Sequence, residues 1–78
     1  MVLEMSVSDV RAKRRVLVLL HELGWSAESG SVRTAHPFSI VVNDVPDADL
    51  ATLRRVIATA DPGATTIGIT RPVAAVAA

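Results

Sequence analysis

The apolar residues of this chain recur with two different periods, and the order of those periods limits the possible folds more than any other feature. At the start, Leu3, Met5 and Val7 alternate with polar residues, as in a half-buried strand. Two later segments have the 3.6-residue period of an amphipathic helix. Strand-like segments separate and follow these helices. The predicted order is therefore strand, helix, strand, strand, helix, strand.

The first helical segment follows Ser8 and Asp9, and either side chain can cap its first turn. It ends at Gly24, because a residue that tolerates positive φ commonly follows the last turn of a helix. Apolar and polar residues fall on opposite arcs. The apolar arc holds Ala12, Val16, Leu19, Leu20 and Leu23, and the polar arc holds Arg11, Arg14, Arg15, His21 and Glu22.

Two strands are expected at residues 26–32 and 38–43, with His36-Pro37 between them, since proline cannot supply a ladder amide. A second helix is expected after a cap at Asp47, with Leu50, Leu53, Val56, Ile57 and Ala60 on one arc. It should end at Asp61-Pro62-Gly63. A last strand at 65–70 would place Ile67 and Ile69 on one face.

This order predicts an α+β, ferredoxin-like fold, with two helices on one face of an antiparallel four-stranded sheet. Right-handed crossovers place the first and third strands at its centre and the 26–32 strand at an edge. We expect one domain at residues 1–72 and a flexible tail at 73–78. A 78-residue chain buries only about 60% of its unfolded surface, which favours association into a dimer.

The composition argues against several classes of function. Eight basic and eight acidic residues cancel, so no net field attracts nucleic acid or a membrane surface. The longest apolar run, residues 16–20, is too short for a signal or spanning helix. Without cysteine there is no disulfide and no thiolate site, which suits a cytoplasmic protein.

No constellation of residues in the sequence predicts catalysis, and neither a cofactor nor a metal is expected. His21 and His36 lie far apart in the sequence, and Asp44, Asp47 and Asp49 lack the spacing of a calcium loop. The serines have no histidine and acid placed to activate them. We therefore expect a protein that is not an enzyme.

Two short motifs resemble the ACT domain, a regulatory module of similar length. They are the turn Ser8-Asp9-Val10-Arg11 and the corner Gly24-Trp25-Ser26-Ala27-Glu28-Ser29. The resemblance covers about residues 3–71, and over this range the chain is similar to the ACT domain in small subunits of acetolactate synthase. ACT domains bind amino acids and similar small effectors where two domains meet, between this turn and the neighbour's second strand.

The resemblance implies ligand-binding roles for residues of both motifs, which are Asp9, Val10, Arg11, Trp25, Ser26 and Ala27. Amides at a helix start and the Arg11 side chain favour a carboxylate, and Asp9 could meet an ammonium. The family usually has glycine where this chain has Arg11, so that side chain either blocks the usual pocket or offers a cation to a different ligand. An alternative role for Trp25 is to cover the end of the first helix without contacting a ligand.

Interface residues are expected on the first helix and on the edge strand. Val18 is apolar within the polar arc, and Ser29 and Ser31 belong to a strand with few packing residues. The basic cluster at residues 11–15 is interpreted as a solvated face.

The expected function is a non-catalytic homodimeric regulator that binds an amino acid and modulates an enzyme of amino-acid metabolism. The alternative is a ferredoxin-like interaction or structural module without a ligand.

Overall fold

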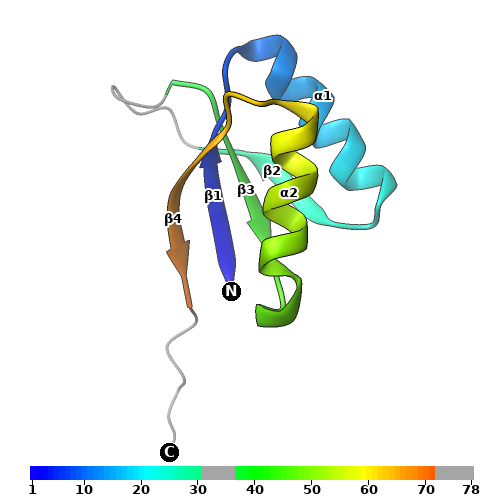
Figure 1. Ribbon diagram of the computed structural model, residues 1–78, viewed down its shortest axis with the longest axis vertical. Helices are drawn as coiled ribbons and strands as arrows, with labels where there is room; N and C mark the ends of the chain where they lie inside the picture. The colour runs from blue at the N-terminus through cyan, green and yellow to red at the C-terminus, as the bar shows by residue number, and fades with distance from the viewer. Residues whose placement is uncertain (31–36, 72–78) are drawn as a thin grey trace, which may run out of the picture.

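The computed structural model describes residues 1–30 and 37–71, so the predictions for Ser31 and for a tail at 73–78 lie outside the described residues. The elements follow the predicted order (Figure 1). Their bounds are β1 Val2–Ser6, α1 Val10–Glu22, β2 Ser26–Ser29, β3 Ser39–Asn43, α2 Leu50–Ala60 and β4 Thr65–Thr70, with a 3-10 turn at Asp47–Asp49 before α2.

The sheet has the order β2-β3-β1-β4, and its neighbouring strands are antiparallel. The prediction that the first and third strands are central and that the strand from Ser26 is at an edge is therefore confirmed. The register aligns Leu3 with Val42 and Met5 with Ile40, which places all four on the same face of the sheet. Helices α1 and α2 cover that face (Figure 1), and the fold is ferredoxin-like α+β.

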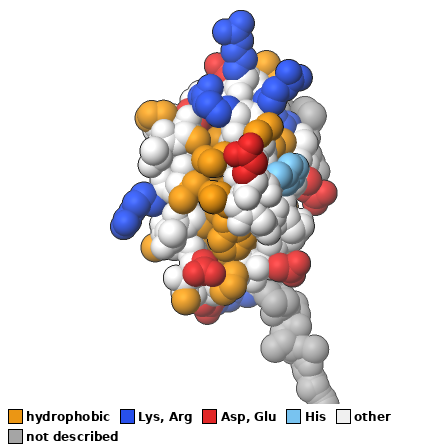
Figure 2. Space-filling view, turned by 90° about the vertical axis from the view of Figure 1, so that its right-hand side faces the viewer, with side chains coloured by type: hydrophobic (Ala, Val, Ile, Leu, Met, Phe, Trp, Pro, Cys, Tyr) orange, Lys and Arg blue, Asp and Glu red, His pale blue; other side chains and the backbone are white. Residues whose placement is uncertain are grey.

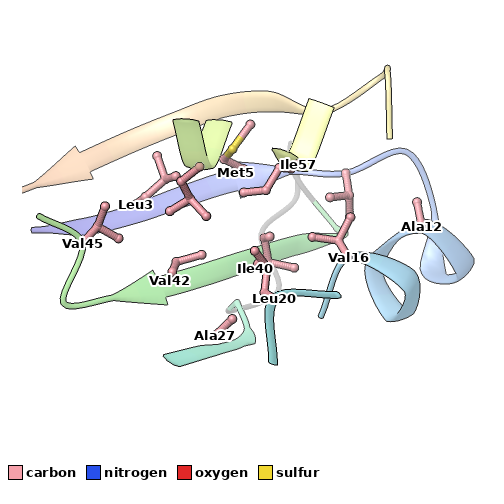
Figure 3. Packing of buried hydrophobic residues seen from close by; sticks show 12 residues of the cluster. Leu3, Met5, Ala12, Val16, Leu20, Ala27, Ile40, Val42, Val45 and Ile57 are labelled. Carbon is pink, nitrogen blue, oxygen red and sulfur yellow. The ribbon is translucent and has the colours of Figure 1, made fainter. Parts of the chain in front are cut away.

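An aliphatic core lies between the sheet and the helices. In Figure 3, Ile40 of β3 lies beside Val16 and Leu20 of α1. These three residues, Leu3 of β1 and Ile57 of α2 are all fully buried. The predicted apolar arcs thus face the core at Ala12, Val16 and Leu20 on α1 and at Leu53 and Ile57 on α2. Among residues 1–30 and 37–71, no helix has the length and apolar content needed to cross a bilayer.

Two predictions fail where helices begin or end. Leu23 is 55% exposed rather than buried, because α1 has ended at Glu22 and the chain is already turning at this point. Asp47 does not cap α2, since the chain enters this helix through the 3-10 turn. Instead, Arg71 Nη1 donates to both Asp47 carboxylate oxygens at 3.0 Å, so Asp47 ties the entry to α2 to the end of β4.

The last strand also departs from simple alternation. Its pairing with β1 shifts between Glu4 and Met5, so that Glu4 faces Gly68 while Met5 faces Thr66. Ile67 is the extra residue of this bulge, and Ile69 lies opposite Leu3 but stays 40% exposed. The inserted residue breaks the period of two, so the regular alternation from which a shared face of Ile67 and Ile69 was predicted is interrupted at this point.

Candidate functional site

The turn between β1 and α1 is held rigidly by an acid from the other end of the sequence. Asp61, directly after α2, accepts hydrogen bonds from the Ser8 amide at 2.8 Å and from the Ser8 hydroxyl at 2.6 Å. The Gly63 amide donates to the same carboxylate at 3.2 Å. A side chain at position 63 would collide with the Ser8 hydroxyl, so glycine is required by the close approach of the two loops. The turn is therefore preorganised.

The electrostatic state of Asp61 follows from these contacts. The side chain is buried, with 3% of its surface exposed, and burial alone would raise its pKa. The hydrogen bonds from Ser8 and Gly63, together with the nearby Arg15 charge, outweigh burial and hold the pKa below its ordinary value of 3.8. Asp61 is thus an ionised structural acid that fixes the position of the turn.

Within that turn, Asp9 acts as the N-cap of α1, since its carboxylate accepts from the Ala12 amide at 2.8 Å. This confirms the capping prediction and gives Asp9 a structural role. Val10 and Arg11 begin the helix, and Val10 is 61% exposed. Together with Arg14 and Arg15 they line an open hollow of about 340 Å³. Of the three predicted turn residues, Val10 and Arg11 therefore remain open to a ligand.

The corner after α1 is a helix end stabilised by backbone hydrogen bonds. Gly24 has φ of 90°, as predicted for the residue that ends this helix, and its amide donates to the His21 carbonyl. The Trp25 amide donates to the Leu20 carbonyl at 2.9 Å, and its side chain packs against the core. The Trp25 side chain is therefore half-buried against the core, and its roles as a cover for the helix end or as a ligand contact stay predictions.

The next two residues of the corner differ in exposure. Ser26 is exposed at the start of β2, and Ala27 is 9% exposed within the core cluster. A buried alanine methyl offers no surface to a ligand. Of the three predicted corner residues, only Ser26 therefore has a side chain that is fully accessible.

His21 has a role that sequence reasoning missed. Its Nε2 lies 2.7 Å from the Ala27 carbonyl oxygen, and because a carbonyl only accepts, Nε2 carries the hydrogen. The Gly30 amide donates inward to the Ser39 carbonyl of β3, so by alternation Ala27 and Ser29 direct their backbone groups outward. His21 therefore satisfies one of the outward groups of this edge strand. Only the spacing of six residues across a tight corner hinted at the contact.

The two groups of predicted ligand residues lie at opposite ends of α1. The helix has 13 residues, and a rise of 1.5 Å per residue separates its ends by about 20 Å. Within one chain, Val10 and Arg11 consequently do not meet Ser26. A small molecule could contact both groups only if a second chain contributed one of them.

The predicted interface residues that the structure describes are accessible. Val18 is 51% exposed on α1, and Ser29 is exposed on β2, whereas Ser31 lies outside the described residues. Figure 2 shows basic side chains gathered at one end of a face and apolar side chains extending beyond them. A hollow of about 270 Å³ lies on α1, lined by Val10, Lys13, Arg14, Leu17, Val18 and His21.

Residues 1–30 and 37–71 contain no group of three or more histidine, aspartate or glutamate side chains that could hold a metal ion. In comparisons with known proteins, no protein family, no curated protein and no solved structure matches the chain.

Proposed function

We propose that the chain is a non-catalytic, cytoplasmic ACT-like regulatory domain that binds an amino acid or similar small effector between two copies of itself. The observation that carries this proposal is the separation of Val10 and Arg11 from Ser26 by the whole length of α1. Each chain offers half of the expected contacts, so a complete site needs two chains. A site of this kind couples ligand binding to assembly, because the ligand favours the state in which both halves are present.

The chemistry of the turn suits an amino-acid carboxylate. Val10 and Arg11 supply amides at the start of α1, where the helix dipole favours an anion, and Arg11 adds a guanidinium. Arg11 and Arg14 have no ion-pair partner within residues 1–30 and 37–71. The preorganised turn reduces the entropy lost when a ligand binds. In this proposal the bound state changes the activity of a separate enzyme of amino-acid metabolism.

The test is thermal unfolding of the purified chain with each of the twenty amino acids. A ligand that binds only the folded state raises the midpoint, by an amount that grows with its concentration. Arg11→Gln should abolish the shift, and Arg71→Gln, which removes the same charge far from the turn, should retain it. If no amino acid moves the midpoint, the regulatory proposal is refuted.

The alternative function is a protein-interaction module of the same fold. It is favoured by a specific observation, the exposure of Val10 and Val18 on the outer side of α1, at 61% and 51%. Sizing of the wild-type chain, Val18→Asp and Ser29→Arg by sedimentation separates the two candidates. A dimer that is indifferent to amino acids but is broken by either substitution would favour the interaction module.

A further inference from the structure

An open hollow of about 510 Å³ lies between α2 and β4, away from both groups of residues discussed above. In Figure 1, β4 lies at the left of the sheet and α2 does not overlie it. The hollow exists because α2 turns small side chains toward β4. Ala51 and Ala58 line its wall, while Leu53 and Ile57 of the same helix point into the core. Larger apolar residues at 51 and 58 would occupy this space.

Two cations border this apolar wall. Arg54 and Arg55 line the hollow, share its side of α2 with the two alanines, and are exposed. Neither guanidinium has an ion-pair partner or a side-chain hydrogen bond within the described ranges 1–30 and 37–71. Two unpaired guanidiniums beside an apolar surface suit an anion, because arginine pairs with a carboxylate through parallel hydrogen bonds.

An unsatisfied hydroxyl on the opposite side of the hollow is an independent observation. Thr66 of β4 lines the hollow, and its Oγ1 is buried without a hydrogen-bond partner among the described residues. A buried unpaired hydroxyl costs about 1–3 kcal/mol in stability. Because Oγ1 has no partner among the described residues, no hydrogen bond to them fixes the Thr66 rotamer. Rotation about the Cα–Cβ bond to another staggered rotamer can turn the hydroxyl toward the hollow that Thr66 lines. The hydroxyl would then reach a ligand in the hollow.

We propose that the α2–β4 hollow binds a small aliphatic carboxylate. The guanidiniums of Arg54 and Arg55 pair with the carboxylate, the aliphatic body packs on Ala51, Ala58 and Met5, and the Thr66 hydroxyl donates a further hydrogen bond. This site is distinct from the one at the β1–α1 turn and does not depend on it. It requires a single chain, whereas the site of the proposed function requires two.

The test is a titration of the ¹⁵N-labelled full chain followed by amide chemical shifts, with hexanoate, hexanol and inorganic phosphate as probes. Hexanoate should perturb amides of α2 and β4 near Ala51, Ala58 and Thr66 in a saturable manner. Hexanol lacks the charge and phosphate lacks the aliphatic body, so each should bind about tenfold more weakly or not at all. Shifts at Val10, Arg11 and Ser26 would instead report on the site of the proposed function.

Variants assign the roles within the hollow. Arg54→Gln and Arg55→Gln should each weaken hexanoate binding by about fivefold or more, and Thr66→Val by a smaller factor. Arg71→Gln removes the same charge after the far end of β4, lines neither hollow, and should leave the affinity unchanged. Ala58→Leu fills the hollow and should abolish binding, with the rest of the spectrum reporting that the fold is intact. Equal binding of hexanoate and hexanol, or unchanged affinity in both arginine variants, would refute the proposal.

Discussion

At the scale of single residues, Asp61 has the most consequential polar contacts, since three hydrogen bonds converge on one buried carboxylate. In Asp61→Asn the side-chain NH₂ would face at least one of the donors of Ser8 and Gly63. Loss of the charged acceptor should lower the free energy of unfolding at pH 7 by about 2 kcal/mol or more. Chemical denaturation measures this directly, and Asp49→Asn, at an exposed carboxylate without a side-chain cap bond, is the matched control.

The lowered pKa of Asp61 predicts that the free energy of unfolding depends on pH. The pKa of Asp61 is lower in the folded chain than its ordinary value of 3.8, so the folded state binds fewer protons than the unfolded state in that range. The stabilisation that ionised Asp61 contributes is fully present above pH 3.8 and is lost as the pH falls through the lower pKa of the folded state. The free energy of unfolding, measured from pH 6 to pH 2.5, should decline less steeply in Asp61→Asn than in wild type. Superimposable slopes would contradict this assignment.

The sequence predicted the local roles of residues better than their long-range contacts. The cap at Asp9 and the positive φ at Gly24 follow from neighbours within one helical turn, and both are confirmed. Asp61 was predicted only to end a helix, because its bond to Ser8 spans 53 residues of sequence. His21 was placed only on the polar arc of the first helix, because its contact with Ala27 depends on how the chain turns at the corner.

At the scale of elements, the end of α1 depends on the backbone conformation of Gly24, which has φ of 90°. Gly24→Ala should lower stability by about 1 kcal/mol, since an L side chain disfavours this conformation. For a domain of this size, that loss corresponds to about 4–8 °C in the unfolding midpoint. Gly68→Ala is the control: a Cβ at either glycine has open space, but only Gly24 has positive φ. Equal midpoints in the two variants would contradict this explanation.

Elements were predictable where a hydrophobic period persists over several turns or residues. The faces of α1 and α2 and the bounds of β4 followed from such periods. The errors occur where the period stops or is interrupted. Leu23 follows the last helical residue of α1, and Asp47 is the first residue of the 3-10 turn before α2. Short irregularities of this kind depend on tertiary contacts that a single sequence does not reveal.

At the scale of the whole molecule, the core is small and is built from many small and medium-sized side chains. Its buried members are aliphatic residues and one methionine, while Trp25 and Phe38, the only aromatic residues of the chain, pack at its periphery. The helices cover one face of the sheet, and β2 and β4 are its two edges. A core of this size gives a narrow margin of stability, to which association would add.

Because the single chain has a narrow margin of stability, self-association should raise the unfolding midpoint by a measurable amount. A dimer formed through α1 and β2, as proposed, gains stability by mass action, so the unfolding midpoint should rise by several degrees over a hundredfold increase in protein concentration. Val18→Asp and Ser29→Arg place a charge on each proposed contact surface without touching the core, because both positions are exposed. Each should remove the concentration dependence while leaving the midpoint at the lowest concentration unchanged. Calorimetry at matched scan rates makes the comparison, and a concentration-independent midpoint in the wild type would rule out the dimer.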